Sequence, residues 1–227
     1  MTFRNRLQYF LVKRLQISNK KALELISVGA CRVASKQVFE NVEIQPFEEI
    51  ICEGEILREE KKLYYIAFYK PVGIETTLNQ AIPDNLQAIL PFEEKLFPVG
   101  RLDKASEGLL LLTNDGRVFD KTLRKEHQTE KEYIVKVDKP ITDSFIQQMS
   151  SGITIMGQTT LPCFVEAIDE YNFRIILVQG LNRQIRRMCY KLDYEVLSLK
   201  RIRIDQVHLG DLKPNEYREV GELIGET

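Results

Sequence analysis

The stretch GRLDKASEGLLLLTNDG, residues 100–116, joins a charged loop to a short apolar run. The run Leu109–Leu112 is closed by turn-forming residues that end at Gly116, which predicts a buried strand followed by a turn. The charged residues before the run lie where a loop held by a rigid sheet can present side chains to a ligand. Asp103 is therefore the first candidate for a functional residue. The alternative is that Asp103 only caps a turn or pairs with a nearby cation such as Lys104.

The composition is that of an ordinary globular protein, since 44% of the 227 residues are apolar and 29% are charged. This length allows one large domain or two domains of which one is small. No apolar run reaches 18 residues and the first residues lack an apolar signal core, so we expect a cytoplasmic protein without a membrane segment. The four cysteines form no Cys-x-x-Cys pair and both histidines stand alone, which argues against a metal site or a disulfide framework.

Charge is distributed unevenly along the chain although the net charge is only −1. Between Met1 and Lys36 the only acidic residue is Glu24, against eight basic residues. From Phe39 to Glu60 the sign reverses, and Arg58 is the only basic residue. The basic N-terminal segment has the electrostatic character of a protein that binds a phosphate backbone.

Apolar residues at helical spacing predict two short helices near the N-terminus, one over Leu7–Leu15 and one after Ser18. Ser18 is expected to cap the second helix, which leaves Lys20 and Lys21 in its exposed first turn. Small strands joined by polar turns are expected from Cys31 to Ile44.

Residues from about Arg6 to Ile56 resemble an S4 RNA-binding domain. The matching features are the two helix openings, Gly29 at the end of the second helix and the acidic turn Glu53-Gly54-Glu55, although Ala34-Ser35-Lys36 replaces the usual Asn-Gly turn. The resemblance implies that structured RNA binds to the basic side chains of Arg6, Lys13, Arg14, Lys20, Lys21 and Arg32. The alternative is a solvated basic surface on a small helical lobe.

A charged run, Glu55–Lys62, has little to bury and suggests a linker. We therefore predict an RNA-binding domain at residues 1–57, a linker at 58–62 and a second domain at 63–227. The second domain opens with an aromatic strand that ends at Lys70, because the following proline cannot donate to a sheet.

Three helices are expected in the second domain, over about Arg117–Lys125, Thr142–Ser150 and Arg183–Leu192. The strands between them outnumber the helices and do not alternate with them strictly. We therefore expect an α+β fold with a mainly antiparallel or mixed sheet and flanking helices.

Arginines recur towards the C-terminus, and the first three would share one face of the third helix. They are Arg183, Arg186, Arg187, Arg201 and Arg203. Such a cluster repels itself unless an anion lies against it. RNA phosphates or a buried carboxylate could supply that anion, and Asp103 is a reasonable carboxylate because a catalytic aspartate must stay ionised in its pocket. A solvated basic helix is the alternative.

Several motifs in order resemble the RsuA-type ribosomal RNA pseudouridine synthases. They are Lys70-Pro71-x-Gly73, Pro98–Asp103 with Gly108–Gly116, Lys131-Glu132-Tyr133 and Gly180–Met188. Together with the S4-like segment they cover nearly the whole chain. Within the family, the segments that begin at Lys131 and Leu181 look most like the large-subunit synthase F group.

The resemblance implies that a uridine within RNA is isomerised and that Asp103, Tyr133 and Arg186 form the catalytic set. Asp103 would act as a nucleophile or as the base that takes a sugar proton, Arg186 would be its ion-pair partner and Tyr133 would stack on the uracil. The target base must be flipped out of its stack. Further substrate contacts are implied for Arg101, which would fill the vacated space, for Leu199, which would close the pocket, and for Lys70, Arg183 and Arg187.

The expected substrate is ribosomal RNA, with the large subunit favoured. Small-subunit RNA or transfer RNA remains an alternative substrate, and a non-catalytic RNA-binding assembly factor is the alternative from another class. The isomerisation needs neither a redox partner nor a group donor, so we expect no metal and no small-molecule cofactor. We also expect the protein to be a monomer.

Overall fold

A computed structural model describes residues 3–118 and 129–221. The chain forms two compact units, Met1–Leu63 and Tyr64–Thr227, and each is considered by itself. No helix in the described ranges is long and apolar enough to span a membrane.

The first unit packs two helices against a small antiparallel sheet of order β2-β1-β3-β4. The Ser18 side chain accepts a hydrogen bond from the backbone N–H of Lys21, which confirms it as the cap of the second helix. Leu7, Leu11 and Ile26 are fully buried between the helices and the sheet. The elements are η1 (Phe3–Asn5), α1 (Leu7–Leu15), α2 (Asn19–Ser27), β1 (Cys31–Val33), β2 (Lys36–Val38), β3 (Ile50–Cys52) and β4 (Glu55–Arg58).

Strand β4 corrects the expectation that the charged run after Cys52 has little to bury. Leu57 is buried in this strand, which pairs with β3 through a tight turn. Glu53 and Gly54 both have positive φ in the turn, as a two-residue hairpin requires. The expected strands at Val42 and Ile44 are absent from the structure.

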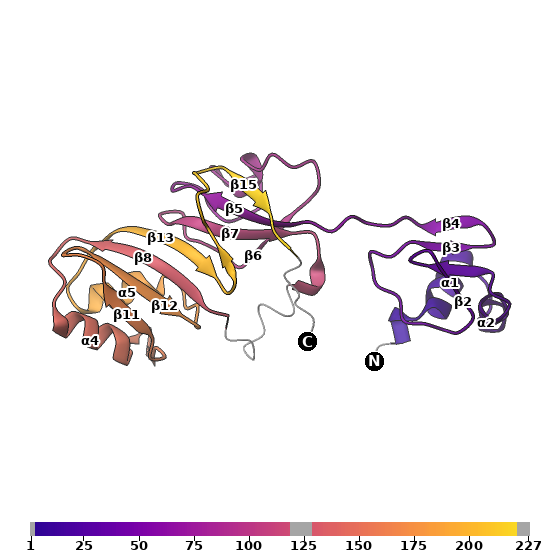
Figure 1. Cartoon of the computed structure of the whole chain (residues 1–227), viewed down its shortest axis with the longest axis horizontal. Helices are drawn as coiled ribbons and strands as arrows, with labels where there is room; N and C mark the ends of the chain where they lie inside the picture. The colour runs from indigo at the N-terminus through magenta and orange to yellow at the C-terminus, as the bar shows by residue number, and fades with distance from the viewer. Residues whose placement is uncertain (1–2, 119–128, 222–227) are drawn as a thin grey trace. The chain divides into compact units, whose positions relative to one another are not determined.

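The second unit is built on a mixed nine-stranded sheet (Figure 1). Seven strands follow the order β11-β12-β8-β13-β7-β5-β15, while β6 pairs with β7 and β14 pairs with β13. All pairs are antiparallel except β13 with β7, which is parallel. The strands are β5 (Tyr65–Lys70), β6 (Phe97–Val99), β7 (Glu107–Thr113), β8 (Lys131–Val137), β11 (Phe164–Ala167), β12 (Asn172–Leu177), β13 (Val196–Ile204), β14 (Val207–His208) and β15 (Tyr217–Glu219), with a separate pair β9 (Thr154–Ile155) and β10 (Gln158–Thr159).

Helices α4 (Asp143–Ser151) and α5 (Gln184–Lys191) cover the part of the sheet formed by β8, β12 and β13, as Figure 1 shows. Met149 and Met188 on these helices are fully buried against Val135 of β8. The arrangement confirms the expected α+β fold with a mixed, mainly antiparallel sheet and flanking helices.

Helix α4 lies where the sequence predicted a helix, and the Thr142 hydroxyl caps it by accepting from the Phe145 N–H. A short 3₁₀ helix, η2 (Leu86–Ala88), lies in the connection between β5 and β6. The helix expected over Arg117–Lys125 falls mostly outside the described residues. Strand β15 was not expected, because its three residues are all exposed and carry no alternating pattern.

Candidate active site

Asp103 lies, partly buried, in the loop between β6 and β7. The backbone is held at each residue from Arg101 to Ala105. Side chains donate to three of the five carbonyls: Arg201 to that of Arg101 (3.4 Å), Thr76 to that of Leu102 (2.7 Å) and Arg186 to that of Ala105 (2.8 Å). Backbone N–H groups donate to the other two: Ser106 to the carbonyl of Asp103 (3.0 Å) and Gly73 to that of Lys104 (2.8 Å).

This loop forms one wall of a pocket of about 450 Å³. Gly73 and Glu75 come from the connection after β5, and Arg183 comes from the start of α5. An exposed ion pair joins Lys104 to Asp84 at 3.1 Å, so the cation next to Asp103 in sequence is engaged elsewhere. The full lining is Val72, Gly73, Glu75, Asp103, Lys104, Ala105 and Arg183.

Arg186 ties α5 to the loop that carries Asp103. Its Nη2 donates to the carbonyl of Ala105 at 2.8 Å, and its Nη1 donates to the carbonyl of Val196 at 3.0 Å. Burial lowers the pKa of Arg186 and the nearby charge of Arg183 adds to this, whereas the negative charge of Asp103 opposes it. Asp103 thus acts on Arg186 through its charge, and among the described residues no ion pair within 4 Å joins the two side chains.

Arg183 does not lie on a helix face with Arg186 and Arg187 as the sequence suggested. Arg183 precedes α5 and has a φ of 51°, in the left-handed region, so it is not part of the helical repeat. It is exposed and reaches the pocket. Arg187 is also exposed and donates to the carbonyl of Asn182 at 3.1 Å.

Tyr133 on β8 lies directly opposite Arg201 on β13 in the antiparallel register. Side chains of directly opposed residues share one face of a sheet. Leu199, which pairs with Val135 in the same register, lies on this face too and is only 7% exposed. Both Tyr133 and Leu199 pack in the core formed with α5, the helix that carries Arg186.

Lys70 at the end of β5 is fully buried. Its Nζ donates to the carbonyls of Pro71 and Ile74, each at 2.8 Å. Burial lowers the pKa of Lys70 to about 8, although the negative charges of Glu75 and Asp103 favour its protonated form. Lys70 thus shapes the connection that lines the pocket rather than reaching into it.

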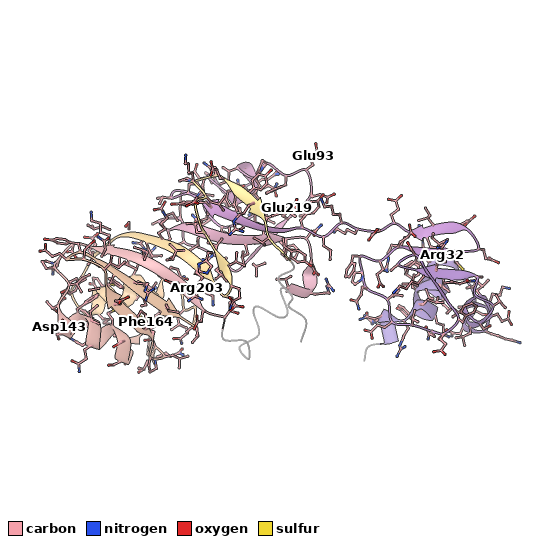
Figure 2. All side chains as sticks on the ribbon, in the orientation of Figure 1. Arg32, Glu93, Asp143, Phe164, Arg203 and Glu219 are labelled. Carbon is pink, nitrogen blue, oxygen red and sulfur yellow. The ribbon has the colours of Figure 1, made fainter. Side chains whose placement is uncertain are left out.

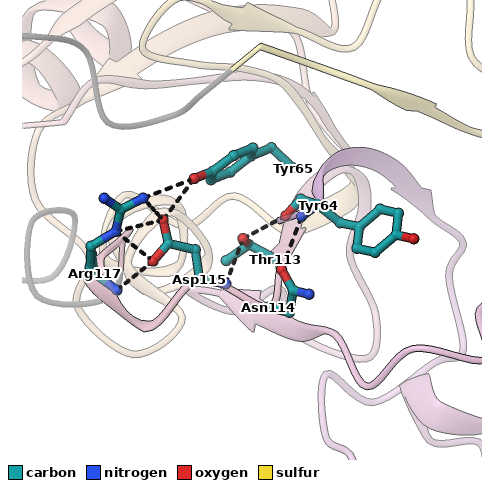
Figure 3. Close-up of polar contacts among 6 residues, drawn as sticks. All are labelled: Tyr64, Tyr65, Thr113, Asn114, Asp115 and Arg117. Carbon is teal, nitrogen blue, oxygen red and sulfur yellow. Dashed lines mark hydrogen bonds and ion pairs between the residues drawn. The ribbon is translucent and has the colours of Figure 1, made fainter. Parts of the chain in front are cut away.

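The second half of the opening stretch supports the fold, as Figure 3 shows. Asp115 is 3% exposed and accepts from Arg117 (2.7 Å) and from the Tyr65 hydroxyl (2.7 Å). Burial by itself would raise the pKa of Asp115, but these hydrogen bonds outweigh burial and hold the pKa below its usual range. The carboxylate of Asp115 is therefore committed to structure, unlike that of Asp103.

Sequence reasoning missed Thr76, and it counted Arg201 in the arginine cluster without giving it a role. Thr76 is buried, and its hydroxyl both donates to the Leu102 carbonyl and accepts from the Leu102 N–H at 3.2 Å. Arg201 is 3% exposed and donates to the carbonyls of Leu109 and Arg101. A threonine and one arginine in a basic segment carry no sequence signal that separates them from surface residues. The Arg101 side chain itself is exposed.

The predicted RNA-binding side chains of the first unit are exposed at Lys13, Arg14, Lys20, Lys21 and Arg32. Arg32, labelled in Figure 2, lies on β1. Arg6 is partly buried and donates to the carbonyl of Asn41 at 2.9 Å, so it also holds the first unit together. In residues 3–118 and 129–221, no three His, Cys, Asp or Glu side chains gather in a way that could hold a metal ion.

Comparisons with known proteins agree with this fold. Residues 64–191 match the model of the RNA pseudouridylate synthase family. The dual-specificity RNA pseudouridine synthase RluF of Escherichia coli K12 is 42% identical over 205 residues, which cover 89% of this chain and 71% of RluF. Ribosomal large subunit pseudouridine synthase B of Bacillus subtilis is 29% identical over 238 residues, with 96% of each chain covered.

A crystal structure of a pseudouridylate synthase superposes with a TM-score of 0.66 at 28% identity and covers 95% of this chain and 96% of that one. The chain therefore belongs to the RNA pseudouridylate synthase family. It is an RNA pseudouridine synthase, an isomerase related to RluF and to the RsuA-type enzymes, as the motifs predicted.

Proposed function

We propose that the chain converts a specific uridine of large-subunit ribosomal RNA into pseudouridine, with Asp103 as its catalytic carboxylate. The observation that carries this assignment is the restraint of the Asp103 loop, in which the carbonyls of five successive residues accept hydrogen bonds. Catalytic groups must be held in place before substrate arrives, because misplacement by about 1 Å can lower a rate by about 10²-fold. Asp103 is the one carboxylate on this restrained loop.

The isomerisation breaks the bond between N1 of uracil and C1′ of the ribose and makes a bond between C5 and C1′. C5 then loses its proton and N1 gains one, so no oxidant or group donor is consumed. Asp103 serves either as the nucleophile that holds one fragment or as the base that takes a sugar proton. Arg186 places a positive charge near Asp103 and ties its loop to α5.

Tyr133 stacks on the uracil and takes part in removal of the C5 proton. Leu199, on the same sheet face, closes the pocket beneath the base. Arg101 is exposed next to the loop and enters the space left by the flipped base, while Arg183 and Arg187 contact phosphates at the mouth of the pocket. Lys70 supports the wall of the pocket by holding the carbonyls of Pro71 and Ile74 in the connection after β5.

The choice of large-subunit RNA rests on the resemblance of the motifs to the synthase F group. Chemical mapping of pseudouridine in total RNA, from cells with and without the gene, tests it. We expect one uridine of large-subunit RNA to lose its modification. Loss confined to small-subunit RNA would contradict the proposed substrate but not the chemistry, and no loss anywhere would contradict both.

A second candidate substrate, transfer RNA, is favoured by one observation, the dual specificity in the name of the Escherichia coli relative. The same mapping of pseudouridine in total RNA tests whether transfer RNA is a substrate. Loss of a transfer RNA site together with the large-subunit site would show that this chain also has two substrates.

We further propose that the first unit binds the RNA through Lys20 and Lys21 in the first turn of α2. The variant Lys20→Glu/Lys21→Glu should weaken RNA binding and reduce its dependence on salt, because each lost phosphate contact releases about one fewer counterion. The turnover number at saturating RNA should stay unchanged. Lys36→Glu, an equally exposed change on β2, is the control. Equal binding by the double variant and the wild type would contradict this role.

A further inference from the structure

Arg201 is the most buried arginine in the described part of the second unit, at 3% exposure. The pairing of β13 with β8 explains on which face of the sheet the Arg201 side chain lies. Arg201 pairs with Tyr133, but Arg203 pairs with Glu132, so Ile202 between them is an extra residue. Such a bulge turns the two arginines to opposite faces of the sheet, Arg201 to the face of Tyr133.

On its other side β13 runs parallel to β7, and Arg201 lies beside Gly108. The two backbones approach so closely that a Cβ at Gly108 would come within 2.2 Å of the Arg201 carbonyl oxygen. This approach lets the guanidinium reach the neighbouring loop. Its Nε donates to the carbonyl of Leu109 at 2.7 Å and its Nη1 to the carbonyl of Arg101 at 3.4 Å. The two carbonyls lie on either side of Asp103 in the chain.

The charge of Arg201 is not matched by a carboxylate in the way that the charge of Arg203 is. Arg203 forms ion pairs with Glu132 at 2.6 Å and Glu130 at 2.9 Å. Among the residues that the structure describes, Arg201 forms no ion pair and its Nη2 is buried without a hydrogen-bond partner. A buried cation of this kind costs stability, which is a reason to look for a functional role.

We infer that Arg201 is a positioning residue for the isomerisation: its guanidinium fixes the Asp103 loop to the strand pair that carries Tyr133. The inference rests on the proposed role of Asp103. A guanidinium suits this task because it donates in two directions in one plane, whereas an ammonium group is a single point of charge. The substituted enzyme should therefore bind RNA normally and turn it over slowly.

The test uses full-length Arg201→Lys and Arg201→Met, with Arg203→Lys and Arg203→Met as matched controls from the same strand. Circular dichroism gives the folded fraction of each, and single-turnover rates at saturating enzyme are normalised to it. We expect the rate of Arg201→Met to fall by about 10²-fold and that of Arg201→Lys by at least about tenfold, with RNA affinity within about threefold of wild type. The Arg203 variants should lose thermal stability but keep rates within about threefold.

A folded Arg201→Lys or Arg201→Met with a rate within threefold of wild type would overturn the inference. Losses that match those of the Arg203 variants would overturn it too, because they would show a purely structural role. If Arg201→Met does not fold, Arg201→Lys decides, since it keeps the charge and most of the side-chain volume. Asp103→Asn is measured alongside. Full activity of Asp103→Asn would contradict the proposed site itself, whereas an inactive Asp103→Asn with an active Arg201→Lys would contradict only this inference.

Discussion

The two faces of β8 and β13 differ in whether their charged side chains form ion pairs. On one face a chain of ion pairs crosses four strands, from Glu130 through Arg203, Glu132 and Arg174 to Glu166, and each guanidinium meets carboxylates. Figure 2 labels Arg203 within this network. On the other face Arg201 is buried without an ion pair in the described chain, and Lys131 has a pKa lowered by burial and by the charge of Arg201.

The difference indicates which face of the sheet stabilises the fold and which face supports the candidate active site. Charges that neutralise one another hold strands together, whereas unpaired buried cations beside a pocket create a positive environment for an anionic group. Tyr133 lies on the second face, and Arg201 reaches from it to the Asp103 loop. We therefore expect substitutions on the Tyr133 face to change rates and substitutions on the Glu132 face to change stability.

After Asp103 itself, the largest effect is expected at Tyr133. Tyr133→Phe keeps the ring that stacks on uracil but removes the hydroxyl, so turnover should fall by about 10²- to 10⁴-fold, the usual contribution of a proton-transfer group. RNA affinity should stay unchanged. Single-turnover assays measure the rate, with Tyr171→Phe at an exposed turn as control. Turnover of Tyr133→Phe within about threefold of wild type would remove Tyr133 from the proton transfer.

Arg186→Lys should have the next largest effect. A lysine offers one nitrogen in place of the two guanidinium nitrogens that donate to the carbonyls of Ala105 and Val196, so the tie between α5 and the Asp103 loop weakens and turnover should fall by about 10²-fold. Arg174→Lys is the control, because it disturbs the ion pairs of the opposite face. A larger rate loss in Arg174→Lys than in Arg186→Lys would reverse the comparison.

Glu132→Gln should change stability and not rate. Glu132 is 8% exposed and forms ion pairs with two arginines, so the substitution removes one carboxylate partner from each cation. We expect the free energy of unfolding in urea to fall by about 1–3 kcal/mol, with turnover of the folded enzyme within about threefold. A rate loss beyond tenfold at unchanged stability would place Glu132 in the chemistry instead.

The smallest effect concerns Lys70 and pH. Its pKa in the folded chain is about 8, below its value of 10.5 in the unfolded chain, so between these values the unfolded chain binds more protons. The unfolding free energy of wild type should therefore rise, relative to Lys70→Met, as pH increases from 8 to 10.5. Urea titrations at several pH values measure this difference. A difference that stays constant across the range would show that Lys70 does not titrate there.

Local signals predicted much of the fold. Ser18 caps α2 as expected, α4 forms where a helix was predicted, and the run Leu109–Leu112 is buried in β7. Strands β4 and β15 were missed because their residues are mostly charged or exposed and show no clear alternation, although the turn at Glu53-Gly54 before β4 was expected. The position of Arg183 before α5 was also missed, since a left-handed φ at an arginine has no signature in sequence.

The candidate site divides in the same way. Asp103, Tyr133 and Arg186 were singled out from motifs, and their catalytic roles remain predictions. Thr76 was not singled out and Arg201 was given no role within the arginine cluster, because the importance of both depends on contacts between distant segments. Register set by a bulge at Ile202 and a close approach at Gly108 exists only in the folded sheet.

The central claim is that Asp103 performs the chemistry and that the surrounding structure serves to hold it. The most direct measurement compares pseudouridine formed in a single turnover by wild type, Asp103→Asn and Asp84→Asn, all at saturating enzyme on the same RNA. Asp84 is a carboxylate close to the loop through its exposed ion pair with Lys104. We predict no detectable product from Asp103→Asn with RNA affinity preserved, and a wild-type rate from Asp84→Asn. A folded Asp103→Asn that forms pseudouridine at a rate near that of wild type would contradict the account.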